Sequence, residues 1–254
     1  MNVPVLMYHR VVARLPRAAS SDFVVSRDTF RQHLRYLVER GLHTPTIAQA
    51  LRTTDPLTAE RSILLTFDDG YVDNYTEALP LLLEHKLRAT FFVVADQRRR
   101  RNFWDVDTAN SNARLMEAHQ LRAMVSAGME IGSHSVSHPR LALLDDDAAL
   151  LELRDSRRIL EDIIGAPVDS FAYPFGSLSP RVKGLVRRAG YRAAFAVNSG
   201  PFDFHADPFE IRRVLIADRA EEPYLFAKIS GLEKAARTSS SFLKSLVPET
   251  MRTP

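Results

Sequence analysis

Short apolar segments alternate with longer amphipathic segments along most of the 254-residue chain. The apolar segments are rich in β-branched and aromatic residues at consecutive positions, which is typical of parallel strands buried on both faces. The amphipathic segments carry helix signals, with Ser before the first turn, Pro in it or Gly after the last one. This pattern predicts strands at 4–8, 63–67, 90–95, 129–133, 170–173, 193–197 and 213–217, and helices at 26–40, 74–86, 116–127, 145–164 and 179–190.

Alternation of strands and helices over nearly the whole length implies parallel pairing, with the helices outside. We therefore predict an α/β fold: a single-domain, distorted (β/α)7-8 barrel with parallel strands and outer helices, formed by residues 1–230. Residues 231–254 show no clear core pattern and carry a run of Thr and Ser, so we expect a helical or mobile C-terminal appendage. In such barrels the reactive groups lie at the C-terminal ends of the strands.

The amino-acid composition limits which metal ligands, membrane segments and partners the protein can have. There is no cysteine, so a metal site would have to use His, Asp or Glu. No apolar run approaches the roughly 20 residues that span a bilayer. No signal peptide is visible at the N-terminus, so we expect a cytoplasmic protein, or a secreted one if residues are missing there. The net charge of +3 permits anionic partners without requiring them, and the Arg98–Arg101 run is read either as a solvated loop or as a contact to an anionic substrate.

Two polar clusters follow predicted strands. Asp68 and Asp69 follow the strand at 63–67, and adjacent side chains at a strand end point in different directions. His134 and His138 follow the strand at 129–133, and histidines four residues apart share one side of a helical turn. Together the clusters supply two imidazoles and one carboxylate for a hydrolytic metal, with a second carboxylate left over as a base.

Three segments in this order resemble a known family. Thr-Phe-Asp-Asp-Gly at 66–70, His-Ser-Val-Ser-His at 134–138 and Phe-Ala-Tyr-Pro-Phe-Gly at 171–176 are similar to the motifs of polysaccharide deacetylases of carbohydrate esterase family 4, the NodB homology domain. The resemblance covers roughly residues 3–217. It implies that Asp68 is the catalytic base and that Asp69, His134 and His138 bind a metal, usually Zn²⁺. It also implies that the backbone N–H of Phe175 helps to hold the oxyanion, with Tyr173 of the same motif near the substrate. The donor set itself would also accept Co²⁺, Ni²⁺ or Mn²⁺.

The sequence departs from the family at two points. The third motif usually carries an Arg that orients the base, but this chain has Ala172, and we expect Arg213 to replace it. The usual late Leu-x-His motif, which supplies the general acid, has no His here, where Leu215 lies in the comparable strand. His9 resembles the early His of the exopolysaccharide (poly-N-acetylglucosamine) deacetylase branch and is the favoured acid; His205 is the alternative.

Trp104, the single Trp, follows the strand at 90–95 and is a candidate either for stacking on a sugar ring or for packing. The leading hypothesis is a metal-dependent N-deacetylase acting on an N-acetylated amino-sugar polymer, oligomer or conjugate. The same site could hydrolyse an amide of a non-sugar metabolite. A distant alternative is an inactive glycan- or nucleic-acid-binding domain; nucleic acid is not expected as a partner, because no recognised binding motif is present. The sequence does not predict an oligomeric state.

Overall fold

A seven-stranded parallel sheet forms the centre of the protein. The computed structural model describes residues 3–15, 23–52, 61–105, 112–197, 199–201, 203–204 and 206–219. The predicted appendage at 231–254 lies outside these residues. The strand order is β8-β7-β6-β5-β4-β1-β9, and the strands are β1 (Val5–Tyr8), β4 (Leu64–Phe67), β5 (Thr90–Val93), β6 (Glu130–Ser133), β7 (Ser170–Ala172), β8 (Ala193–Phe195) and β9 (Val214–Leu215).

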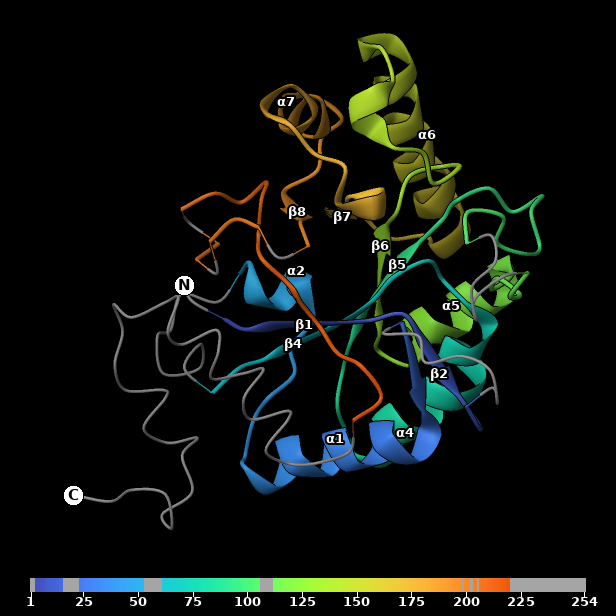
Figure 1. Ribbon diagram of the computed structural model, residues 1–254, viewed down its shortest axis with the longest axis vertical. Coiled ribbons are helices and arrows are strands. Elements are labelled where there is room, and N and C mark those ends of the chain that lie inside the picture. The colour runs from blue at the N-terminus through green and yellow to red at the C-terminus, as the bar shows by residue number, and fades with distance from the viewer. Residues whose placement is uncertain are drawn as a thin grey trace.

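The sheet curls into a half-barrel surrounded by helices, which confirms the predicted barrel class (Figure 1). The chain between its two edge strands brings those edges towards each other. Ile211 forms a parallel bridge with Phe195 of β8, and three residues later Val214 pairs with Leu6 of β1. The segment 211–215 therefore connects one edge of the sheet to the other, and Arg213 lies in the middle of it.

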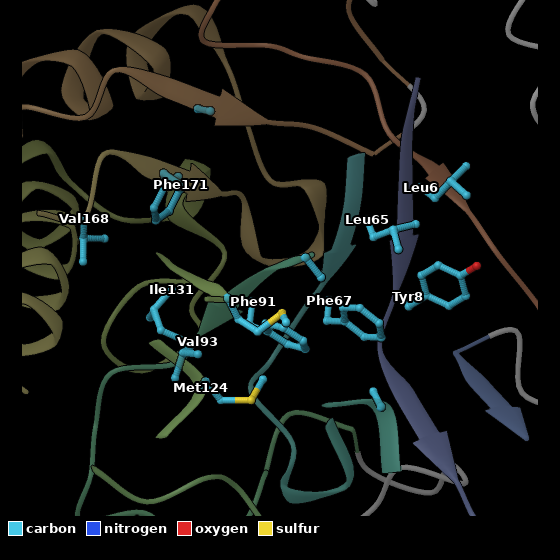
Figure 2. Close-up of a cluster of buried hydrophobic side chains, with 14 of the residues drawn as sticks. Leu6, Tyr8, Leu65, Phe67, Phe91, Val93, Met124, Ile131, Val168 and Phe171 are labelled. Atoms are coloured by element: carbon cyan, nitrogen blue, oxygen red, sulfur yellow. The ribbon is translucent and has the colours of Figure 1, made fainter. Parts of the chain in front are cut away.

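Alternate residues of the strands face opposite sides of the sheet, as the two-residue period of a strand requires. On the outer side an aromatic row crosses three strands: Tyr8 stacks on Phe67 with ring centroids 5.2 Å apart, and Phe67 on Phe91 at 4.7 Å. Figure 2 shows this row beneath Leu65 and beside Val93. On the inner side Leu64, Phe92 and residues of β7 and β8 form a smaller apolar cluster.

The five longer helices pack on the outer side of the sheet. In Figure 1, α1 and α4 lie along one part of the sheet, while α6 and α7 lie near β7 and β8. Predicted helix starts at Ser26, Asp145 and Ser179 are confirmed, because each side chain accepts a hydrogen bond from a first-turn N–H. The helices are α1 (Arg27–Glu39), α4 (Leu79–Glu84), α5 (Ala118–Ser126), α6 (Asp146–Ile164) and α7 (Pro180–Arg188).

The predicted helix at 74–86 is present, but it is not an α-helix throughout. Asn74–Ala78 (η1) forms a π-helical turn, and α4 begins at Leu79. Asn74 is fully buried, and its side-chain amide donates to the carbonyl of His9 at 2.8 Å. A π-turn of this kind commonly marks a functional site. Elements without a sequence prediction are β2 (Arg10–Val12), β3 (Val24–Ser26), α2 (Ile47–Ala50), η2 (Leu141–Leu143) and η3 (Pro174–Gly176).

Candidate active site

The candidate residues gather where the parallel strands end. Asp68 directly follows β4, and its N–H donates to the carbonyl of Tyr8, the last residue of β1. His134 directly follows β6, and its N–H donates to the carbonyl of Val93, the last residue of β5. Backbone pairing of neighbouring strands therefore fixes where these side chains start, as expected for a parallel barrel.

Asp69, His134 and His138 converge on one point. The carboxylate Oδ1 of Asp69 lies 3.4 Å from Nε2 of His134 and 3.3 Å from Nε2 of His138. The three ligand atoms lie within 4.8 Å of one another, and all three residues are buried. Asp69 has a left-handed backbone, with φ 72°, which turns its side chain away from that of Asp68. The two neighbouring carboxylates are thereby separated into two different environments.

Hydrogen bonding at this cluster fits a divalent cation. Nδ1 of His134 lies 2.8 Å from the carbonyl oxygen of Ala172, so it must donate, which leaves the lone pair of Nε2 directed towards Asp69. Oδ1 of Asp69 is buried and accepts no hydrogen bond of acceptable geometry. Buried acceptor atoms that face one another without a donor are unfavourable unless a cation lies between them. The donor set, two imidazoles and one carboxylate, suits a divalent transition metal.

The two histidines do not share a helical turn, contrary to the prediction. Residues 134–138 form a loop, in which Ser135 has φ 65° and His138 has φ 59°. Oγ of Ser135 accepts the N–H of His138 at 3.0 Å and closes the loop. β6 ends before His134, and no helix follows it. The strained loop at 134–138 therefore brings the two imidazoles together.

Asp68 forms a bidentate ion pair with Arg213. The guanidinium Nη1 and Nη2 donate to the two carboxylate oxygens at 2.6 and 2.8 Å, and Arg213 is wholly buried. Its Nε also donates to the carbonyl of Ala196 at 3.2 Å, and the guanidinium lies over the ring of Phe92. Arg213 therefore fixes the orientation of the Asp68 carboxylate from inside the barrel.

His9 lies at the end of β1, beside the first residue after β4. Its Nδ1 is buried and has no hydrogen-bond partner within the described residues, and its ring packs edge-on against Phe23. Burial lowers the pKa of His9, while the negative charges of Asp68 and Asp69 oppose that effect. His9 is therefore close enough to both carboxylates to feel their charge. The alternative acid, His205, lies outside the described residues.

Comparison with known proteins decides the family. A family model described as polysaccharide deacetylase matches residues 56–194. The chain belongs to the polysaccharide deacetylase family. Membership makes the protein a hydrolase of N-acetyl amides.

Relatives of this deacetylase have low sequence identity but share the fold. The poly-beta-1,6-N-acetyl-D-glucosamine N-deacetylase of Staphylococcus aureus (strain COL) is 21% identical over 227 residues, which cover 85% of this chain and 75% of that protein. The deacetylase PplD of Streptococcus pyogenes, solved in complex with acetate, has a TM-score of 0.78 at 23% identity and covers 90% of this chain and 98% of that one. The structure of IcaB from Ammonifex degensii has a TM-score of 0.67 at 25% identity, with 91% and 96% covered.

Aromatic rings surround the imidazole of His138 in the deacetylase. Trp104 stacks on it with centroids 4.4 Å apart, and Phe175 packs edge-on from another direction at 4.5 Å. Nε1 of Trp104 also donates to Oδ2 of Asp69 at 3.4 Å. Trp104 thus packs against the metal cluster, and it remains only partly buried, whereas Phe175 is 43% exposed at the rim.

Tyr173, which was predicted to lie in the substrate site, belongs to the core instead. The hydroxyl of Tyr173 is buried and donates to the carbonyl of Phe209 at 2.7 Å, so its side chain belongs to the core. Leu215 lies half-buried on β9, in register with Met7 of β1. Tyr173 was not distinguishable from a site residue by sequence alone, because strand-end residues alternate between the inside and the outside of the barrel.

The charges of the two aspartates are stabilised in different ways. Burial would raise the pKa of Asp68, but Arg213 and His134 outweigh it, and the pKa of Asp68 lies below its usual value. Burial would likewise raise the pKa of Asp69, but its contacts with His134 and His138 hold it well below the usual value. Both carboxylates are therefore ionised at neutral pH. Asp68 pairs with a guanidinium, and Asp69 lies between two imidazoles.

Sequence reasoning missed a hydrogen-bonded group behind Trp104. The hydroxyl of Tyr71 donates to Asp105 at 2.9 Å, and the side-chain amide of Asn102 donates to that hydroxyl at 3.2 Å. Burial and the nearby charges of Asp69 and Asp105 raise the pKa of Tyr71 far above its usual value, so it stays neutral. The one available signal was that Tyr71 directly follows the Asp-Asp-Gly motif.

The Arg98–Arg101 run has partners within the protein. Arg98 and Arg99 both pair with Asp96, at 2.9 and 3.5 Å, and Arg100 pairs with Glu117 at 3.3 Å. These exposed pairs support the reading of a solvated loop. Among the described residues, no helix is both long and apolar enough to cross a membrane.

Proposed function

We propose that this deacetylase uses one divalent metal ion, held by Asp69, His134 and His138, to remove N-acetyl groups from an amino-sugar-containing glycan. The observation that carries the proposal is the convergence of two buried Nε2 atoms on an unpartnered carboxylate oxygen. A second buried carboxylate, Asp68, lies next to this cluster in the chain and is held ionised by Arg213. Zn²⁺ is the ion we expect, and Co²⁺, Ni²⁺ or Mn²⁺ would also suit these donors.

When bound, such an ion acts as a Lewis acid that polarises the amide carbonyl and makes a water molecule more acidic. Asp68 takes the proton of the attacking water. Each of its oxygens bonds one guanidinium N–H and keeps a second lone pair for this purpose. Arg213 holds the carboxylate in place and disfavours its protonation before the reaction.

His9 gives a proton to the departing nitrogen in the proposed reaction. His9 lies beside Asp68, at the neighbouring ends of β1 and β4, so the proposed acid and base belong to one site. The backbone N–H of Phe175 stabilises the negative charge that develops on the carbonyl oxygen of the substrate amide during the attack. Phe175 has φ 56°, a strained conformation that is common where backbone groups are aimed at a reacting atom.

The substrate we propose is an N-acetylated glycan of the glucosamine type, either polymer, oligomer or conjugate. Support comes from the Staphylococcus aureus relative, which is named for poly-beta-1,6-N-acetyl-D-glucosamine. The exposed part of Trp104 and the ring of Phe175 provide apolar surface beside the cluster, against which a sugar ring could stack. Leu215 would contribute apolar contact on the β9 side.

Acetate release from N-acetylglucosamine oligomers, measured with zinc and with a chelator, tests the proposal. We expect activity that is lost with the chelator and restored by zinc.

Asp68→Asn should keep the metal and lose about 100- to 10,000-fold in kcat, the contribution of a general base. His9→Ala should keep the metal and lower kcat more than it changes KM. Chelator-insensitive hydrolysis would exclude the metal mechanism, and full activity of either variant would exclude that residue's role.

A further inference from the structure

The loop that carries His138 is held in a conformation that it would not adopt alone. Ser135 and His138 both have left-handed backbones, which disfavour any residue with a Cβ. Nδ1 of His138 is buried and has no hydrogen-bond partner within the described residues, so no hydrogen bond orients the ring from the side opposite Asp69. The position of this imidazole therefore depends on its backbone and on the flanking rings of Trp104 and Phe175.

Backbone contacts hold one side of this loop. The carbonyl groups of Ser135 and Val136 accept hydrogen bonds from the N–H groups of Ala95 and Asp96, at 3.0 and 3.1 Å. These contacts extend the pairing of β5 with β6 past the end of the strands. The N–H groups of residues 136 and 137 need hydrogen-bond acceptors on the side of the loop away from β5.

Glu152 of α6 binds the other side of the loop. Its Oε2 accepts the N–H groups of Val136 and Ser137 at 2.8 and 2.9 Å, and its Oε1 accepts the hydroxyl of Ser137 at 2.6 Å. Hydrogen bonds to an ionised acceptor are shorter and stronger than those between neutral groups. One half-buried carboxylate thus satisfies three donors of the segment between the two metal ligands.

The same helix also holds the strand that leads into the loop. Ser156 lies one turn after Glu152, on the same face of α6, and accepts the hydroxyl of Ser133 at 2.8 Å. Ser133 is the residue before His134. The helix is itself anchored by its buried residues, among them Leu150, Leu153 and Leu160.

We propose that Glu152 is a positioning residue for the metal site: by holding the backbone of residues 136 and 137 against α6, it sets the place of His138. This inference rests on the proposed function. Glu152 is not among the clustered ligands, and its two oxygens are already engaged by the loop. Its effect on the cation is therefore indirect, through the distance between His138 and the other two ligands.

The test is the metal affinity of Glu152→Leu, whose side chain has no oxygen to accept the three hydrogen bonds from the loop. Zinc affinity is measured by chelator competition, and ligand geometry by the visible absorption spectrum of the Co²⁺-loaded protein. Loss of an outer partner of a metal ligand typically weakens metal binding about 10- to 100-fold. We expect a loss in that range, together with a changed Co²⁺ spectrum. Wild-type affinity and an unchanged spectrum in a folded Glu152→Leu protein would overturn the proposal.

Two further variants keep the test decisive. Asp155→Asn removes a carboxylate from the same helix, where Asp155 pairs with Arg158 at 3.8 Å, and it should bind zinc as the wild type does. Ser137→Ala removes only the 2.6 Å bond and should weaken zinc binding less than Glu152→Leu. If Glu152→Leu does not fold, Ser137→Ala decides, and unchanged zinc affinity in it overturns the proposal. Failure of the wild type to bind zinc would instead refute the proposed function.

Discussion

Replacing Arg213 by methionine would leave Asp68 as a buried carboxylate without its counterion. The guanidinium is wholly buried and provides both hydrogen bonds of the pair, at 2.6 and 2.8 Å. Removing one partner of a buried ion pair costs about 3–5 kcal/mol, because the remaining charge has lost its compensation. A domain is typically stable by about 5–15 kcal/mol, so the variant should fold but unfold at clearly lower denaturant concentration.

The loss should depend on pH in a defined direction. In the wild type the pKa of Asp68 is lowered on folding, so its stabilising effect is present above the unfolded pKa and is lost as pH falls through the folded one. In Arg213→Met, burial acts with much less opposition, and we expect the folded pKa of Asp68 to rise above its unfolded value of about 3.9. The difference in unfolding free energy between the two proteins should therefore begin to shrink as pH falls through the raised folded pKa of Asp68 in the variant, above about 4, and should keep shrinking until pH has passed the lowered folded pKa in the wild type.

Activity should change with pH in the same way. A raised pKa leaves part of Asp68 protonated and unable to act as a base, so the acid limb of the kcat profile should move to higher pH. Arg212→Met is the matched control, because Arg212 is the neighbouring residue and donates to the carbonyl of Gly200 instead. Urea unfolding of the metal-free proteins and acetate release across pH measure the two effects. An acid limb at the same pH in Arg213→Met and the wild type would refute the reasoning.

Three further predictions each concern a single residue. Trp104 is the single Trp and stacks on a proposed ligand, so zinc titration should change the intrinsic fluorescence saturably at one equivalent; a flat titration with bound zinc would contradict this placement. Gly132→Ala should destabilise the protein by about 1–3 kcal/mol, because the new Cβ would lie 2.6 Å from the ring of Phe92 inside the barrel. Gly184→Ala, in α7 with no atom within 4 Å of the new Cβ, should instead stabilise it by about 0.5–1 kcal/mol; both are measured by chemical unfolding.

Much of the fold was predictable because its signals are local. Apolar runs mark the buried strands, and the residues at Ser26, Asp145 and Ser179 cap the helices that follow them. The helix at 74–86 was predicted, but its π-helical first turn was not. The side chain of Asn74, buried against the backbone of His9, accompanies a π-turn there, and that contact is not visible in a periodic pattern.

The candidate site was predictable only in part. Asp68 and His134 end strands, so their positions on the rim follow from the strand order and the parallel topology. The histidine pair was expected on a helical turn, but it lies on a loop stabilised by Ser135 and Glu152. Glu152 lies outside the motif, so the spacing of the two histidines could not reveal it. Tyr173 belongs to the third motif, yet its hydroxyl is bound in the core.

The sequence by itself determined the residue types of the site, the succession of strands and helices, and the ends of strands at which Asp68 and His134 would stand. The family resemblance suggested Arg213 as the partner of Asp68, but only the tertiary structure showed the bidentate pair between these residues, which lie 145 positions apart. Only the tertiary structure showed that Glu152 binds the loop of His138. The physical reason is that strand and helix signals come from neighbouring residues, whereas an ion pair or an anchor between distant segments forms only when the sheet curls and brings its edges together.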